Sequence, residues 1–127
     1  MKKTIATTKA PAAIGPYSQA IEAGGLLYIS GQLPIDAATG TMPVDIGEQA
    51  QVSLRNIEYI LQEAGLDRND VVKTTIFLKN LADFDRVNRI YGDFFAGSAF
   101  PARSTMEVAR LPRDASIEIE AIAVKNE

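Results

Sequence analysis

The alternation of apolar and polar positions first becomes regular between residues 17 and 34, where two short β-forming runs flank Gly24-Gly25. A glycine pair can adopt the positive φ angles of a two-residue turn, so the pattern predicts a β-hairpin with Ala23 opposite Leu26. Side chains alternate between the two faces of a strand. The face expected in the core carries Ala20, Leu27, Ile29 and Leu33. The other face is rich in hydroxyls and amides, from Tyr17, Gln19, Tyr28, Ser30 and Gln32.

Helical periodicity begins after residue 44. Asp45 and Glu48 have the spacing of a capping box, and Gly65 is suited to end a helix in the left-handed conformation. Between them apolar residues recur at steps of three and four, which predicts an amphipathic helix. Its apolar stripe consists of Ile46, Ala50, Leu54, Ile57, Leu61 and Ala64. A second helix is predicted from about Asp83 to Ala96, with an apolar face of Phe84, Val87, Tyr91, Phe94 and Phe95.

Three further runs predict β-strands, at residues 71–80, 102–109 and 116–125. In the first of them Val72, Ile76 and Leu78 are expected to point into the core. The last two strands are joined by RLPRDA, whose proline suits a turn. A tight hairpin through residues 112 and 113 would place Glu107 opposite Glu118.

The last predicted strand has apolar residues on both faces. One face carries Ile117, Ile119, Ala121 and Ala123, and the other begins with Glu118 and Glu120 but continues with Ile122 and Val124. Such a strand is usually covered on both sides. Two helices can cover one face of a small sheet, so we expect another subunit to cover the second face. The order of elements predicts an α+β fold with the helices on one side of the sheet.

Composition narrows the chemistry. A chain of 127 residues suits one domain, residues 1–127, and its net charge of −3 without long Lys/Arg runs argues against a nucleic-acid surface. The absence of Cys excludes disulfides, thiolate nucleophiles and Cys-ligated zinc. The absence of His removes the usual acid, base or metal ligand near neutral pH. No apolar run is long enough for a signal sequence or a membrane span, so a cytoplasmic protein is expected.

The segment FPARSTMEVARLP contains the most unusual candidate. Arg103 lies two residues after Pro101 and shares its predicted strand face with Thr105 and Glu107. An arginine in a strand is most often a surface residue or half of a salt bridge, for which Glu107 is a candidate partner. If that face packs on another subunit, Arg103 is instead free to bind an anion, and its planar fork suits a carboxylate.

The other candidates each have a structural alternative. Ser30-Gly31 is commonly a bulge or strand end, but glycine also allows a ligand to approach the backbone N–H. Glu118 shares a face with Glu120 and is a candidate acid or base, although paired glutamates on a strand commonly face solvent. Tyr17 alone would be a core or rim aromatic, and Asn88 alone would be a surface residue. From the residues themselves the function remains open.

Several motifs resemble the RidA/YjgF family of reactive intermediate deaminases. The strongest is PARSTMEVARL followed after five residues by IEI, and the others are APAAIGPYSQA, ISGQLP and VVKTTIFLKNLADF. The resemblance covers nearly the whole chain. It implies a chorismate-mutase-like single domain with a mixed sheet and two helices on one face, assembled as a homotrimer with clefts between subunits.

The family resemblance also implies an activity. It is the hydrolysis of 2-imino acids or 2-amino-enoates, such as 2-iminobutanoate and 2-iminopropanoate, to 2-keto acids and ammonia, without cofactor or metal. By position, Arg103 would bind the substrate carboxylate and Glu118 would orient or deprotonate water. Ser30, Gly31 and Thr105 would hydrogen-bond the substrate, and Tyr17 and Asn88 would line the cleft. A carboxylate close to Arg103 would have a lowered pKa.

Alternatives remain open at this point. Many family members have Cys where this chain has Thr105, which matters only if a thiol contributes. The predicted hairpin separates Arg103 from Glu118, so either the register shifts or the two groups meet across subunits. A keto-acid-binding regulatory trimer and an endoribonuclease are the alternative functions.

Overall fold

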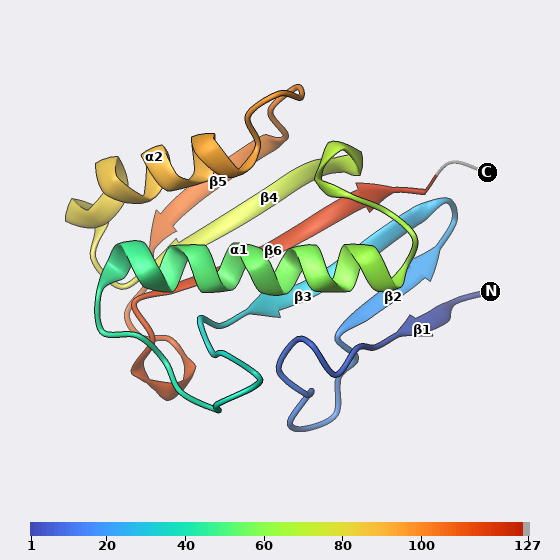
Figure 1. The fold of residues 1–127 in the computed structure, drawn as a ribbon, viewed down its shortest axis with the longest axis horizontal. Coiled ribbons are helices and arrows are strands. Elements are labelled where there is room, and N and C mark those ends of the chain that lie inside the picture. Colours follow the sequence, from blue (N-terminus) through green and yellow to red (C-terminus); the bar gives the residue numbers. More distant parts are fainter. Residues whose placement is uncertain (126–127) are drawn as a thin grey trace.

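The computed structural model describes residues 1–125, which form one six-stranded sheet covered on one face by two helices (Figure 1). The strands lie in the order β1-β2-β3-β6-β4-β5. Their bounds are β1 Lys3–Ile5, β2 Ala20–Ala23, β3 Leu26–Gln32, β4 Val71–Leu78, β5 Ala102–Glu107 and β6 Ile117–Val124. The helices are α1 Ile46–Glu63 and α2 Phe84–Phe94. The β4–β5 pair is parallel and the other pairs are antiparallel, so the sheet is mixed.

The helices α1 and α2 lie side by side on the same face of the sheet (Figure 1), which confirms the predicted α+β layout. The inward side chains of the strands meet the apolar stripe of α1 there, and the buried set includes Leu27, Ile29, Ile57, Ile76, Leu78, Ile117 and Ile119. Among residues 1–125 no helix covers the opposite face, which we call the open face. Glu118, Glu120, Ile122 and Val124 alternate with the buried residues of β6 and therefore lie on it.

The predicted first hairpin is present, with Ala23 paired to Leu26 across the turn. Both turn glycines have positive φ, +60° at Gly24 and +79° at Gly25. A register shift between Ile29 and Gln32 then reverses the alternation of β3. As a result Gln32 pairs with Ile119 and is only 4% exposed, so its predicted place on the polar face is wrong.

A second irregularity corrects the prediction for β4. The register shifts between Val71 and Lys73, which inserts one extra residue. Val71 is therefore buried at 4% exposure, whereas Val72, predicted to point inward, is 43% exposed. Ile76 and Leu78 are buried as predicted.

The predicted hairpin between the last two strands is wrong. β4 lies between β5 and β6, and β5 forms the edge of the sheet (Figure 1). Phe77 of β4 pairs with Met106 on one side and Glu118 on the other. The connection contains a single 3₁₀ turn, Pro112–Asp114, in which Arg113 and Asp114 have positive φ. It carries the chain past β4, so Glu107 and Glu118 are not paired.

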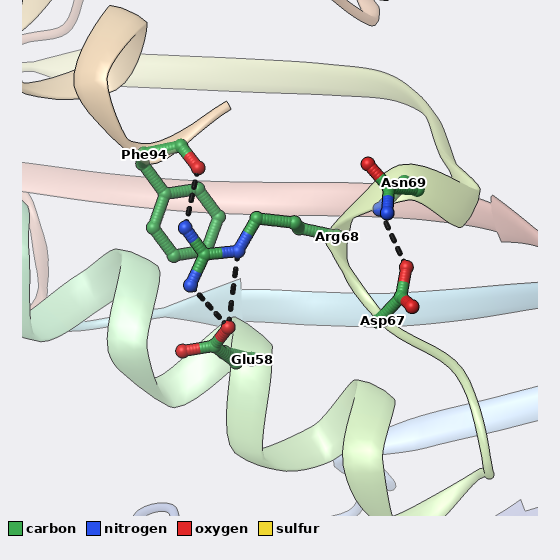
Figure 2. A network of polar contacts seen from close by, with 5 residues as sticks. All are labelled: Glu58, Asp67, Arg68, Asn69 and Phe94. Carbon is green, nitrogen blue, oxygen red and sulfur yellow. Dashed lines mark hydrogen bonds and ion pairs between the residues drawn. The ribbon is translucent and has the colours of Figure 1, made fainter. Parts of the chain in front are cut away.

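Two arginines fasten the helices to one another. Arg86 of α2 donates to both carboxylate oxygens of Asp45, at 2.6 and 2.8 Å, while Asp45 also caps α1 by accepting from the N–H of Glu48. Figure 2 shows Arg68 between the helices: its Nη1 donates to the carbonyl of Phe94 at 2.6 Å and its guanidinium also pairs with Glu58. These contacts hold α2 at a fixed position above β4 and β5.

Candidate active site

Arg103 lies on the helix-covered side of the edge strand β5. It pairs in register with Thr74 of β4, and Thr74 is completely buried beneath α2. Partners in a parallel pair point to the same face. Arg103 therefore faces α2, so the condition under which its face would pack on another subunit, as the face without helices, is not met. The reason is that β5 pairs with β4 rather than β6, which the hydrophobic pattern does not specify.

The guanidinium of Arg103 is held by three residues of α2. Its Nη1 donates to Asn88 Oδ1 at 2.7 Å, and its central carbon lies 4.9 Å from the ring centre of Tyr91 and 5.5 Å from that of Phe84. Asn88 thus contacts Arg103, and it is also exposed on the surface of α2. Sequence reasoning missed Phe84 and Tyr91 as neighbours of Arg103, although their spacing of four and three from Asn88 places all three on one helix face.

Arg103 keeps its positive charge uncompensated. Among residues 1–125 no carboxylate forms an ion pair with it. Glu107, the alternative partner, instead accepts a hydrogen bond of 2.8 Å from the backbone N–H of Leu81. Asn88 accepts a hydrogen bond from only one nitrogen of the guanidinium, so the other N–H groups of Arg103 are available to an incoming anion.

Thr105 follows Arg103 on the same face of β5, paired with Ile76. Its hydroxyl oxygen is shielded from solvent and has no hydrogen-bond partner among residues 1–125. A free thiol behaves as a small hydrophobic group and tolerates such a position better than a hydroxyl. Thr105 therefore has one buried polar atom without a partner in the described chain.

The second group of candidates lies on the open face, at the β3 bulge. A Cβ atom placed on Gly31 would lie only 2.7 Å from the carboxyl carbon of Glu118, so this glycine makes room for the Glu118 side chain. The Ser30 hydroxyl donates to the carbonyl of Ser18 at 2.6 Å. Ser30, which lies beside Gly31, therefore also anchors the segment before β2 through this hydrogen bond. The structure brings Ser30, Gly31 and Glu118 together.

Glu118 is half-buried, and its pKa is raised above the ordinary value of a glutamate. Burial is the main cause, and repulsion from the carboxylate of Glu120 adds to it. The expected lowering of the Glu118 pKa by Arg103 is wrong within one chain. Glu118 pairs with Phe77 on the open face, whereas Arg103 faces α2, so the sheet lies between them.

Tyr17 precedes β2 and is 52% exposed. The segment that carries it is anchored by the buried side chain of Gln19, which accepts from the N–H of Thr7 and donates to the carbonyls of Thr7, Ala10 and Pro11. Tyr17 therefore stands on the surface of a well-fixed loop, and the prediction that it belongs to a strand is wrong.

The open face is hollowed beside this group. A depression of about 440 Å³ lies over β3, β6 and β4, and its lining includes Tyr28, Ser30, Lys73, Thr75, Glu120 and Ile122. Within residues 1–125 there is no cluster of three His, Cys, Asp or Glu side chains that could hold a metal ion. No helix in this range has the length and apolarity to cross a membrane.

These features define an α+β protein whose sheet edge presents an arginine without an acidic partner in the described part of the chain, and whose open face presents a half-buried glutamate. The family model described as endoribonuclease L-PSP matches residues 7–125. The chain therefore belongs to this family, the RidA/YjgF family, which confirms the resemblance seen in the motifs.

Individual relatives cover almost the entire chain. The protein is 54% identical to the 2-iminobutanoate/2-iminopropanoate deaminase of Escherichia coli K12, over 98% of this chain and 99% of the relative. The crystal structure of the E. coli YjgF gene product has a TM-score of 0.95 at 53% identity, covering 98% and 99% of the two chains. E. coli TdcF, solved with bound serine, has a TM-score of 0.95 at 44% identity and the same coverage.

Proposed function

We propose that this protein hydrolyses 2-imino acids, or their 2-amino-enoate tautomers, to 2-keto acids and ammonia. The main support is the guanidinium of Arg103, which α2 holds in place, which has no acidic partner among residues 1–125, and which suits a small carboxylate. The identity of 54% to a relative named for this reaction supports the same assignment. The protein would act in the cytoplasm on imines released by pyridoxal-phosphate enzymes such as threonine dehydratase.

Each candidate residue has a role in this proposal. Arg103 binds the substrate carboxylate, Asn88 and Tyr17 line the cleft, and the backbone of Gly31 and Thr105 hydrogen-bonds the substrate, with Ser30 alongside. Glu118 orients water and accepts its proton as the oxygen adds to the imine carbon. Glu118 returns this proton to the nitrogen, the C–N bond breaks and ammonia leaves, and the hydroxyl of the intermediate loses its proton as the carbonyl of the keto acid forms. A protonated imine is already electrophilic, so positioning of water and a base accounts for the chemistry without a cofactor.

The two halves of the site come together if they belong to different subunits. Arg103 and Glu118 lie on opposite sides of the sheet in one chain, so a single subunit cannot place both against one small acid. The open face also carries exposed Tyr28 and Met106 and the partly buried Ile122. We propose a homotrimer of single-domain subunits in which open faces pack together and each cleft takes residues from two chains.

Sedimentation equilibrium tests this assembly. The wild-type protein is expected to sediment as three chains at micromolar concentration. Ile122→Glu would add a third acid beside Glu118 and Glu120 on the packed face and should give monomers with little activity. Val44→Glu, at an exposed position before α1, should leave the trimer intact and serves as the control. A monomeric wild type would contradict the shared cleft.

Gly31→Ala tests the placement of the Glu118 carboxylate. The added methyl group would displace the end of the Glu118 side chain, which lies 2.7 Å from the new Cβ at its carboxyl carbon. A flexible side chain can move at little cost, so we expect a small change in Tm but a loss of activity of about tenfold or more, corresponding to about 1.4 kcal/mol. Gly92→Ala is the matched control, because its Cβ would meet nothing within 4 Å. Equal activity of the two variants would contradict the role of Glu118.

The activity itself is tested by ammonia release while threonine dehydratase generates 2-iminobutanoate. The purified protein is expected to accelerate the release of ammonia. Tight binding of 2-ketobutyrate without turnover would instead indicate a regulatory trimer. Cleavage of RNA that persists after stringent purification would favour the endoribonuclease activity after which the family model is described.

A further inference from the structure

Three side chains of α2 surround the guanidinium of Arg103, and the spacing of these residues along the helix explains why they lie together. Phe84, Asn88 and Tyr91 are separated by four and three residues, which places them on one face of the helix. Asn88 contacts one nitrogen of Arg103 through a hydrogen bond, while the rings of Phe84 and Tyr91 lie within cation–π distance of the guanidinium. The face of α2 that meets β5 is therefore a complementary surface for Arg103.

Tyr91 is the most firmly fixed of the three. It is only 4% exposed, and its hydroxyl shares a hydrogen bond of 2.6 Å with the hydroxyl of Thr74. Thr74 is also the residue of β4 that pairs in register with Arg103. The ring of Tyr91 packs against that of Phe95, with the ring centres 4.8 Å apart. Tyr91 is thus tied to the same strand pair that carries the backbone of Arg103.

An aromatic ring and a carboxylate interact with an arginine in different ways. The ring attracts the positive charge from the flat side, but it does not take the N–H groups at the edge of the guanidinium. A carboxylate in its place would occupy those N–H groups and compete with a substrate. An arginine side chain without such support would lose considerable conformational freedom on binding an anion.

We infer that Tyr91 is a positioning residue, whose ring, anchored through Thr74, pre-orients Arg103 to receive the carboxylate of a small 2-imino or 2-keto acid. This inference rests on the proposed function, because it assumes that Arg103 binds that carboxylate. Tyr91 itself does not contact the reacting atoms in this scheme. Its contribution is to the binding of the anion in the ground state and the transition state alike.

The test measures the Kd of 2-ketobutyrate by calorimetry together with kcat and KM for 2-iminobutanoate. Tyr91→Leu is expected to weaken Kd about tenfold and to raise KM by a similar factor, with a much smaller change in kcat, because uniform binding is lost. Tyr59→Leu removes a tyrosine that packs against the core from α1, and it should lower Tm without changing Kd. Tyr91→Phe keeps the ring but loses the hydrogen bond to Thr74, so it should restore part of the affinity lost in Tyr91→Leu.

A nearly isosteric pair of variants keeps the test decisive if Tyr91→Leu does not fold. Pentafluorophenylalanine at position 91 reverses the charge distribution of the ring, so its Kd should be several-fold weaker than that of Tyr91→Phe. Equal Kd values in these two variants, or a wild-type Kd in folded Tyr91→Leu, would overturn the inference and leave the proposed function standing. A wild-type protein that neither binds 2-ketobutyrate nor releases ammonia would overturn the proposed function itself.

Discussion

Arg103→Ala is expected to lower kcat/KM for 2-iminobutanoate by about 100-fold, because the substrate carboxylate loses a charge-assisted partner worth roughly 1.5–3 kcal/mol. Arg103→Lys should recover little of this loss. Lysine keeps the charge but lacks the planar fork that binds a carboxylate through two N–H groups, and its ammonium is a poor replacement for the guanidinium beside the rings of Tyr91 and Phe84. The measurement is ammonia release with imine generated continuously by threonine dehydratase.

The control for Arg103 is another arginine near the same helix. Arg89 is exposed on α2, so Arg89→Ala removes the same charge from the molecule and should leave activity unchanged. Both variants should keep the oligomeric state of the wild type, because the apolar side chains of the open face, rather than Arg103, are expected to hold the subunits together. Full activity of a folded Arg103→Ala protein would count against the proposed substrate class.

The sequence predicts the elements around Arg103 but not the side of the sheet on which it lies. Alternation correctly groups Arg103 with Thr105 and Glu107 on one face of β5. Which face this is depends on the neighbouring strand, and the parallel pairing with β4 is a non-local choice. A local turn signal such as Pro112 instead suggests a hairpin with β6. The helix spacing of Phe84, Asn88 and Tyr91 contained information on the correct side.

The bulges are the second feature that the pattern does not reveal. One extra residue near Gly31 points the Gln32 side chain toward the core. A second bulge, at Val72, exposes this valine, which the pattern predicts to be buried. A period of two cannot signal its own interruption, because each half of the strand still alternates correctly. The first bulge is the one that Ser30-Gly31 suggested, and Gly31 there leaves room for Glu118, so the candidate site lies at an irregularity that the glycine indicates and the periodicity does not.

Glu118→Gln is expected to lower kcat by about 100-fold or more, the usual contribution of a positioned general base. Glu118 must be ionised to accept a proton from water, so kcat/KM should rise with pH as this carboxyl loses its own proton. Within one chain, burial and the charge of Glu120 raise the pKa of Glu118, so an acid limb above the ordinary range of a glutamate is expected where these two causes outweigh Arg103 of the neighbouring subunit. The pH profile of the wild type measures this limb.

Glu120→Gln separates the two causes of the raised pKa. It removes the neighbouring negative charge but leaves the burial of Glu118, so the acid limb should move to lower pH while activity at its plateau is retained. The direction is the same whether or not Arg103 of a second copy approaches Glu118, because the repulsion from Glu120 is removed in either case. An unmoved limb would mean that Glu118 does not control the pH dependence.

Stability should change in the opposite direction from activity. A carboxyl whose pKa is raised by folding contributes stability that is fully present below its unfolded pKa and is lost as pH rises through its folded pKa. At neutral pH the ionised Glu118 therefore opposes folding, and the neutral Glu118→Gln variant should have a Tm equal to or above that of the wild type. A variant that is more stable and far less active would indicate that the charge at position 118 serves the reaction rather than the fold. A decrease in Tm together with the loss of activity would instead indicate that Glu118 supports the bulge around Gly31.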